Sequence, residues 1–310
     1  MLFISFVLPA YKAVFLKQAI DSILAQTYTN FELIVVNDAS PDNLDEIVSS
    51  YEDERIRYYK NETNIGGKNL VAQWNHCIEF ATGDYIVLAA DDDVYHPDFL
   101  KKCVELAEKY PLVHLIRTRV EQIGAQNNLV GVDALLPEHC SKYEFLYYWV
   151  QGLAFTCIGN YMFKGPVLQE KKFMELPHAF GSDVVAVVMM AEYGCANTQD
   201  MLFCFRYSPY HLSSSTATHH FKEKIRAVTM EYSYLYTLNY EAPSDRYDSY
   251  FFSRISRSIL YSKCRYDYYN LVIKRLPFRK VHYIAKCELL TRKDKMNLFF
   301  RFCFDKVFKR

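Results

Sequence analysis

The first 110 residues alternate between short apolar runs and segments with helical periodicity, and this alternation restricts the fold most strongly. The apolar runs are rich in β-branched and aromatic residues, so we expect four strands, at 3–8, 31–36, 56–59 and 85–90. Helical patterns lie between and after them, at 14–26, 42–51, 68–80 and 98–110. Continuously apolar strands that alternate with helices are typical of a mostly parallel sheet covered on both faces. The chain is therefore predicted to be an α/β protein.

Polar loops follow three of these strands. They are Pro9-Ala10-Tyr11, Asn37-Asp38 and Asp91-Asp92-Asp93. In sheets of this kind ligands bind outside the carboxyl ends of the strands, so we expect the three loops to converge on one crevice. No G-x-G-x-x-G motif follows the first strand, and no G-x-x-x-x-G-K-[ST] motif occurs anywhere. A glycine-rich loop is therefore not expected to hold phosphates here.

Three consecutive carboxylates follow the fourth predicted strand. Repulsion among Asp91, Asp92 and Asp93 and their partial desolvation would raise some of their pKa values unless a cation is bound nearby. A divalent metal that also binds phosphates explains the cluster economically. The alternative is a solvated acidic turn, which is a common place for Asp. The convergence of the other loops favours the metal.

The pattern after residue 110 is less regular. We expect strands at 113–119, 157–163 and 201–207, helices at 143–150 and 184–193, and a hairpin or irregular excursion at 121–132. A polar loop is expected at 213–218. From residue 219 the pattern is helical almost to the end, with breaks at Ala242-Pro243 and Leu276-Pro277. We therefore expect one α/β domain at 1–215 and a helical C-terminal region at 216–310.

The net charge of zero hides an asymmetry. Residues 246–310 contain 17 Lys and Arg and 5 Asp and Glu, a net of +12, so residues 1–245 carry −12. In this basic segment aromatic and aliphatic residues recur at helical spacing. One interpretation is a peripheral surface for an anionic membrane. The alternative is a set of helices that cap the N-terminal domain and expose a solvated basic face. Nucleic-acid binding is not expected, because no recognised module accompanies the charge.

The cysteines and the apolar segments indicate where such a protein works. Nine cysteines are scattered without any C-x-x-C spacing, so we expect reduced and mostly buried thiols rather than disulfides or a zinc site. Residues 1–8 are too short and lack the basic leader of a signal peptide. The run 184–191 is too short to span a membrane. We therefore expect a cytoplasmic protein, with the inner face of the cell membrane as the alternative location.

Four ordered motifs carry a resemblance to a known family. They are the segments 6–11 (FVLPAY), 19–28 (AIDSILAQTY), 31–40 (FELIVVNDAS) and 91–98 (DDDVYHPD). Together they resemble the family 2 glycosyltransferases of the GT-A fold over roughly residues 3–110. The resemblance implies a Rossmann-like, mostly parallel sheet flanked by helices. It also implies transfer of a sugar from a nucleotide diphosphate donor, with UDP expected, and inversion at the anomeric carbon.

The same resemblance implies roles for residues around the donor. Pro9, Ala10 and Tyr11 correspond to the residues that frame the base, and Asp38 is expected to hydrogen-bond the uracil. Lys68 follows two glycines and is expected near the base or the phosphates.

The Asp cluster corresponds to the family's metal-binding motif. The frequent form is D-x-D-D, but Ala90 stands where the leading Asp would be, so the motif reads as Asp91 and Asp92 or as Asp92 and Asp93. We expect Asp91 to point toward the ribose. Asp92 is expected to be the principal ligand of Mn²⁺ or Mg²⁺, with Asp93 supporting it.

Asp183 corresponds to the catalytic base of the family, an acidic residue at the start of a later helix. An inverting transfer needs one carboxylate to remove the proton of the acceptor hydroxyl. The alternative is that Asp183 is only the N-cap of the helix at 184–193. Many relatives also carry Arg-x-His after the last strand. Here His211 follows Arg206 three positions later than that, so His211 is either a contact to the diphosphate or metal, or a surface residue.

These features predict a metal-dependent inverting glycosyltransferase that acts on a saccharide or lipid-linked acceptor in surface polysaccharide or glycolipid synthesis. A nucleotidyltransferase is one alternative, but it would need a glycine-rich basic loop where residues 9–12 read Pro-Ala-Tyr-Lys. A non-catalytic nucleotide-sugar-binding protein is the other. Asp183 and the Asp cluster argue against it.

Overall fold

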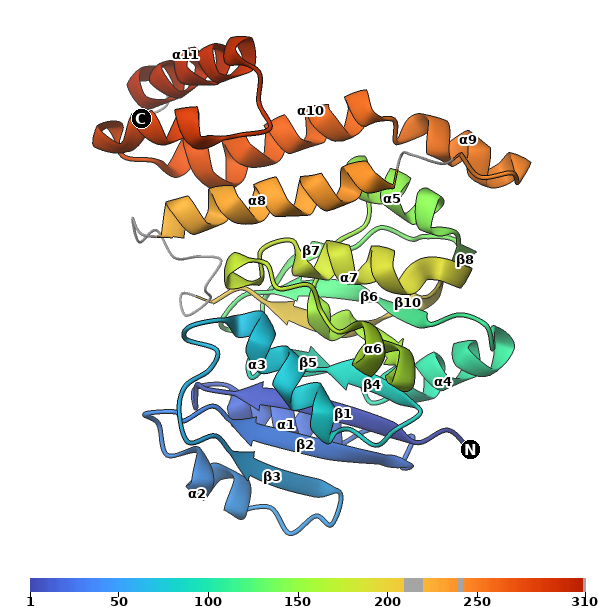
Figure 1. The fold of residues 1–310 in the computed structure, drawn as a ribbon. Coiled ribbons are helices and arrows are strands. Elements are labelled where there is room, and N and C mark those ends of the chain that lie inside the picture. The colour runs from blue at the N-terminus through green and yellow to red at the C-terminus, as the bar shows by residue number, and fades with distance from the viewer. Residues whose placement is uncertain (209–219, 239–241, 309–310) are drawn as a thin grey trace.

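The computed structural model describes residues 1–208, 220–238 and 242–308 (Figure 1). Its centre is a ten-stranded sheet. The main path runs in the order β3 (Ile56–Lys60), β2 (Phe31–Asn37), β1 (Ile4–Ala10), β4 (Tyr85–Leu88), β9 (Tyr161–Lys164), β6 (Leu115–Ile123), β10 (Cys195–Arg206) and β5 (Val94–Tyr95). Two short strands lie off this path: β7 (Leu129–Val132) pairs with β6, and β8 (His139–Cys140) with β10.

Most of the central strand pairs are parallel. β1 pairs in parallel with β2 and with β4, β2 with β3, and β6 with β10, whereas β9 runs antiparallel to both of its neighbours. The predicted mixed, mostly parallel sheet is therefore confirmed. Strands β6 and β7 form an antiparallel hairpin, which settles the two readings of residues 121–132.

Helices cover both faces of the sheet. One face packs against α1 (Leu16–Leu24), α2 (Leu44–Ser49) and α4 (Phe99–Lys109). The other packs against α3 (Leu70–Cys77), α5 (Lys142–Val150), α6 (Gly165–Lys171) and α7 (Ser182–Met190), and α8 (His220–Thr237) packs on α7 within the same buried cluster. Strand β1 feeds both cores, because Phe6 and Leu8 point to the first face and Val7 to the second. Short 3₁₀ turns lie at Ile78–Phe80, Ile158–Asn160, Pro177–Ala179 and Ala191–Tyr193.

The C-terminal helices extend the second core. They are α9 (Arg246–Arg254), α10 (Arg257–Asp267) and α11 (Arg292–Phe308), with a π-helical turn at Tyr268–Val272 and 3₁₀ segments at Ile273–Arg275 and Phe278–Lys286. Figure 1 shows them layered over α8, on the side of the molecule far from β3. Leu260 and Phe302 belong to the same buried cluster as Val7 of the sheet. The division of the chain after residue 215 stays a prediction.

Several predicted boundaries were wrong, and local hydrogen bonds explain one of them. Helix α2 begins at Leu44 rather than at 42, because it is capped by Asn43, whose side chain accepts from the N–H of Glu46. The Ser40 hydroxyl donates to the carbonyl of Tyr11 and accepts from the N–H of Asp42. Strand β10 begins at Cys195 rather than at 201, and β9 begins at Tyr161 rather than at 157.

The thiols behave as the sequence predicts. All nine cysteines are unpaired, and seven are buried. Among the described helices, none combines the length and the apolar character that a membrane crossing needs.

Candidate functional site

The ends of three neighbouring strands are tied together by hydrogen bonds. Asp91, after β4, accepts the N–H groups of Tyr11 and Lys12 on one carboxylate oxygen, at 2.9 and 2.8 Å. The N–H of Asp38, after β2, donates to the carbonyl of Ala10 at the end of β1, at 3.0 Å. The three polar loops therefore meet at the carboxyl ends of β1, β2 and β4, as expected from the parallel topology.

Asp38 is buried and organises the turn that precedes α3. One of its oxygens accepts from the Asn61 side chain and from the N–H of Ile65, and the other from the N–H of Gly66 at 2.7 Å. A side chain at Gly66 would not fit, because its Cβ would lie 2.8 Å from that second oxygen. Next to Asp38, Ala39 adopts the left-handed region at φ 50°. Strained backbone of this kind is often found at functional sites.

The proposed base-framing residues leave one aromatic ring exposed at this edge. Pro9 and Ala10 are the last residues of β1, and the Tyr11 side chain that follows is 38% exposed. The carbonyl of Tyr11 accepts from the Ser40 hydroxyl at 2.6 Å, which joins the loops after β1 and β2. Lys68 is also exposed and follows the turn that Asp38 holds.

Arg206 joins the Asp cluster to the end of β10. Its N–H donates to the Asp93 carboxylate at 2.9 Å, and its Nε donates to the main-chain carbonyl of Asp92 at 2.6 Å. The same guanidinium bonds Gln18 of α1 and Asn127 of the β6–β7 turn, and it stacks on the ring of Phe15 at 4.4 Å. The sequence predicts no structural role for Arg206, which serves there only for comparison with the Arg-x-His motif. Its position at the end of an apolar strand could have indicated a role at the site.

The crowding of the three carboxylates affects their protonation. Burial raises the pKa of Asp91, and the charge of Asp92 raises it further, while the N–H groups of Tyr11 and Lys12 act in the opposite direction. Burial and the charge of Asp92 also raise the pKa of Asp93 well above its ordinary value, despite the N–H of Arg206. The three carboxylates at 91–93 therefore do not form a simple solvated acidic turn, which was the alternative interpretation.

The donor set of this cluster fits a divalent cation that shares its coordination with a ligand. Carboxylate oxygens suit Mg²⁺ and Mn²⁺, and a cation would offset the repulsion that raises the pKa values. Within residues 1–208, 220–238 and 242–308, no group of three or more His, Cys, Asp or Glu side chains is arranged to hold a metal ion.

Asp183 lies in the first turn of α7. The N-cap position is occupied by Gly181, at φ 80°, so the interpretation of Asp183 as a plain N-cap was wrong. Burial raises the pKa of Asp183, although the Thr156 hydroxyl and the N–H of Val184 favour the charged form. A carboxylate with a raised pKa is a stronger base once it is ionised.

A buried thiol connects Asp183 with the Asp cluster in space. Burial raises the pKa of Cys157 well above its usual range, and the charges of Asp93 and Asp183 raise it further. Both carboxylates are therefore close enough to the same sulfur to act on it.

Glu231 is a carboxylate near Asp183 that the sequence did not reveal. It projects from α8, is only 5% exposed, and packs on Gly181, whose added Cβ would meet a Glu231 oxygen at 2.5 Å. Burial, then the charges of Asp267 and Asp183, raise the pKa of Glu231 to about 8. The available signal was its position on the buried face of α8, beside Val228, Tyr232 and Leu235. His211, the other candidate near this region, lies outside the described residues.

Comparison with known proteins identifies a family for the N-terminal half of the chain. The model of "Glycosyl transferase family 2" matches residues 5–169. A putative glycosyltransferase of Bacillus subtilis, EpsE, is 41% identical over 106 residues, which is 33% of this chain and 37% of that protein. A putative colanic acid biosynthesis glycosyl transferase of Escherichia coli, WcaA, is 38% identical over 122 residues, or 39% and 42% of the two chains. The matches thus span less than half of these relatives.

Solved structures share the fold over nearly the whole chain. TarS 1-349 of S. aureus, in complex with UDP-GlcNAc, aligns with a TM-score of 0.64 at 15% identity, covering 98% of this chain and 92% of that one. The mannosyltransferase PcManGT of Pyrobaculum calidifontis, in complex with GDP-Man and Mn²⁺, aligns with a TM-score of 0.55 at 12% identity, covering 99% and 87%. At this identity the likeness shows the fold, and it includes the C-terminal helices.

Proposed function

The chain belongs to glycosyltransferase family 2, and on that basis we propose that it transfers a sugar from a nucleotide diphosphate donor, with a divalent metal and with inversion. The observation that carries the proposal is the joining of the β1, β2 and β4 ends through Asp91 and Asp38. This arrangement places an exposed aromatic ring, a glycine turn and an acidic cluster at one edge of the sheet.

The donor is proposed to be a UDP-sugar that binds over the end of β1. Pro9, Ala10 and Tyr11 frame the uracil, whose N–H bonds Asp38. A carboxylate has about four acceptor sites, so three bonds within the protein leave Asp38 capacity for one more. Lys68 contributes a positive charge toward the base or the phosphates, and Asp91 hydrogen-bonds the ribose with the oxygen not engaged by Tyr11 and Lys12. The complex of TarS with UDP-GlcNAc supports this choice of nucleotide.

Asp92 is proposed as the principal metal ligand and Asp93 as the second. Arg206 fixes the position of this pair, because it donates hydrogen bonds to the Asp92 carbonyl and to one Asp93 oxygen. When bound, Mn²⁺ or Mg²⁺ offsets the negative charge that develops on the departing diphosphate. The complex of PcManGT with GDP-Man and Mn²⁺ supports the metal requirement.

Asp183 is proposed as the catalytic base. It accepts the proton of the acceptor hydroxyl as that oxygen bonds the anomeric carbon and the bond to the diphosphate breaks. Attack on the face opposite the leaving group inverts the configuration. The raised pKa of Asp183 makes its ionised form a better proton acceptor than an ordinary Asp.

The acceptor is proposed to be a saccharide or a lipid-linked saccharide in surface polysaccharide or glycolipid synthesis. The support is the name of one relative, a putative colanic acid biosynthesis glycosyl transferase.

The test is an assay of sugar release and transfer from a panel of nucleotide sugars, with the product anomer identified by NMR. We expect metal-dependent turnover of a UDP-sugar and a product of inverted configuration. A product of retained configuration would overturn the proposed mechanism. Binding of nucleotide sugars with neither release nor transfer would instead assign the chain to the non-catalytic binders.

A further inference from the structure

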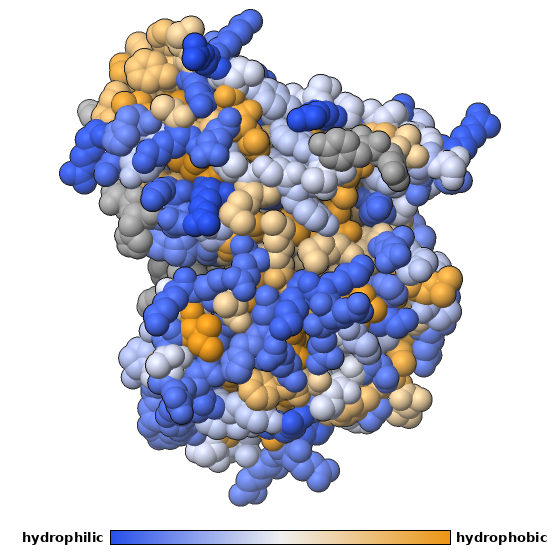
Figure 2. All heavy atoms as spheres, in the orientation of Figure 1, coloured by the Kyte–Doolittle hydropathy of each residue, from blue (hydrophilic) through white to orange (hydrophobic). Residues whose placement is uncertain are grey.

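The outward face of α11 is apolar. Six large apolar side chains of this helix are exposed, with Phe300 at 63% and Phe308 at 71%; they are Met296, Phe299, Phe300, Phe304, Val307 and Phe308. The opposite face packs on the body of the protein through Leu298 and Phe302. Figure 2 shows hydrophobic side chains gathered at the upper left, over α11, beside strongly hydrophilic ones. Exposed apolar surface of this kind commonly marks an interaction site.

The charges of α11 are sorted between its two faces. Its two carboxylates turn toward the body, where Asp294 accepts from the Tyr261 hydroxyl and the Arg265 guanidinium, and Asp305 accepts from the Tyr269 hydroxyl. At the helical angle per residue, Lys295 and Lys306 adjoin the apolar face at the Phe299 edge, and Arg301 adjoins it at the Phe308 edge. Three cations therefore border the exposed apolar face, whereas both carboxylates of α11 are bonded to the body of the protein.

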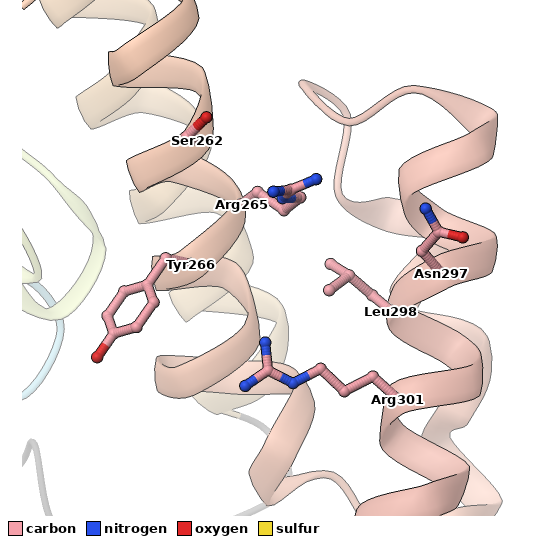
Figure 3. Close-up of a pocket in the computed structure, with 6 residues that line it drawn as sticks. All are labelled: Ser262, Arg265, Tyr266, Asn297, Leu298 and Arg301. Carbon is pink, nitrogen blue, oxygen red and sulfur yellow. The ribbon is translucent and has the colours of Figure 1, made fainter.

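A cavity of about 320 Å³ opens between α10 and α11 beside this face. Figure 3 shows Arg265 of α10 and Arg301 of α11 reaching into it from opposite walls, while the Tyr266 ring points away. Arg265 keeps one bond to Asp294 at 3.1 Å, and Arg301 stacks on the ring of Tyr269 at 4.0 Å. A guanidinium has five donors in a planar fork that matches a phosphate. Asn297 and Ser262 add further polar groups to the walls.

We propose that α11 docks on an anionic phospholipid bilayer, with its apolar face in the boundary between headgroups and acyl chains and a lipid phosphate between Arg265 and Arg301. An amphipathic helix with cations along its apolar face is the arrangement that binds such surfaces. Charge complementarity selects this occupant over a second copy of the chain, because two copies of the face would bring like charges together. The proposal is independent of the transfer reaction, since it concerns residues far along the chain from the donor site.

The test is flotation of the full chain with phosphatidylglycerol-rich vesicles and with vesicles of phosphatidylcholine alone. We expect binding to the anionic vesicles, weaker binding to the neutral ones, and release by salt. The double variant Phe300→Ser and Phe304→Ser should bind at least about tenfold more weakly, because two exposed aromatic rings no longer enter the bilayer. The matched control, Leu112→Ser with Leu135→Ser, removes side chains that are 68% and 60% exposed outside the C-terminal helices and should bind like wild type.

A separate variant tests the proposed phosphate contact in the cavity. Arg301→Gln should weaken binding to anionic vesicles about fivefold and weaken binding to neutral vesicles less, because the choline cation of phosphatidylcholine offsets the charge of its phosphate. Lys101→Gln, an exposed cation on α4, is the charge control. Equal binding of wild type and the double variant would overturn the proposal. So would a dimer in sedimentation analysis that the Phe substitutions dissociate and that binds neither kind of vesicle, since this would assign the face to a second copy. Unchanged melting temperatures show that the variants fold.

Discussion

Asp91 accepts main-chain N–H groups of the loop after β1 on one carboxylate oxygen, and Asp93 accepts the N–H of the last residue of β10. Asp92 lies between them in the sequence. These bonds explain why the three residues differ in role although they are adjacent and identical. Asp91 orders the loop after β1, and Asp93 orders the end of β10. Sequence reasoning found the cluster and its neighbours because the motifs are local. It could not find the bonds to Arg206, because these depend on a strand 110 residues later.

The first residue-scale prediction concerns Asp183, the proposed catalytic base. Asp183→Asn keeps the shape of the side chain and removes its ability to accept a proton at neutral pH. We expect donor binding to be retained, and the transfer rate to fall by about 10²–10⁴-fold. Calorimetry and a transfer assay measure the two effects separately. Asp200→Asn, an exposed residue on β10, is the control. Full transfer by the Asp183 variant would return this residue to a structural role.

The second residue-scale prediction concerns Glu231. Its pKa is raised to about 8 in the folded chain from an ordinary value of 4.5, so the folded state binds its proton more tightly than the unfolded state. The stability linked to this proton is complete below about pH 4.5 and is lost as the pH rises toward 8. Each unit of pKa difference corresponds to about 1.4 kcal/mol.

Glu231→Gln removes that titration. The variant is expected to lose less stability than wild type between these two pH values, as measured by urea unfolding across the range. The raised pKa values of Asp91, Asp93 and Asp183 remain, so part of the pH dependence persists in the variant. Glu170→Gln, an exposed residue on α6, should follow wild type. A Glu231 variant with the wild-type pH dependence would show that Glu231 does not hold a proton.

At the scale of elements, the first 110 residues were predictable because each strand is continuously apolar and each helix has one apolar face. The hydrogen bonds of single polar residues were not predictable. Asn43 caps α2, so this helix begins two residues later than its sequence pattern indicates. The proximity of Glu231 to Asp183 was not predictable either, because the packing of α8 against Gly181 at the N-cap of α7 is a tertiary contact.

The element-scale prediction concerns Arg206, which links β10, α1, the Asp cluster and the β6–β7 turn. Arg206→Lys keeps the charge but cannot reproduce bonds to Asp92, Gln18 and Asn127 at once. We expect a loss of about 1–3 kcal/mol in the free energy of unfolding, together with weaker donor binding. Denaturant titration and calorimetry measure these. Arg279→Lys, at an exposed position, should leave both quantities unchanged. An Arg206 variant that also leaves both unchanged would contradict the proposed linking role of Arg206.

At the scale of the whole molecule, the basic C-terminal region is part of the same folded body as the acidic sheet. Tyr232 and Leu235 of α8 and Leu260 of α10 are buried in the cluster that also contains α7. The sequence had separated these parts by charge and by the loss of family motifs. Neither signal reports on packing, so the sequence could not decide between helices that cap the sheet domain and a separate membrane-binding surface.

The whole-molecule prediction follows from this shared core. A fragment that ends at residue 215 would expose the apolar face of α7 and lose the α8 contact at Gly181. We expect it to aggregate or to lack cooperative unfolding, as judged by circular dichroism and sedimentation. A monomeric 1–215 fragment that unfolds cooperatively and binds the donor would show instead that the catalytic domain is independent.

The central claim is a metal-dependent nucleotide-sugar site at the ends of β1, β2 and β4, and calorimetric titration of UDP into the full chain tests it most directly. With Mn²⁺ present we predict binding to wild type and none after metal removal by EDTA. Asp92→Asn should lose the metal-dependent part of the binding, while Asp200→Asn should keep it. Binding of UDP that is the same with Mn²⁺, with EDTA and in the Asp92 variant, or no binding of any nucleotide diphosphate with metal present, would contradict the account.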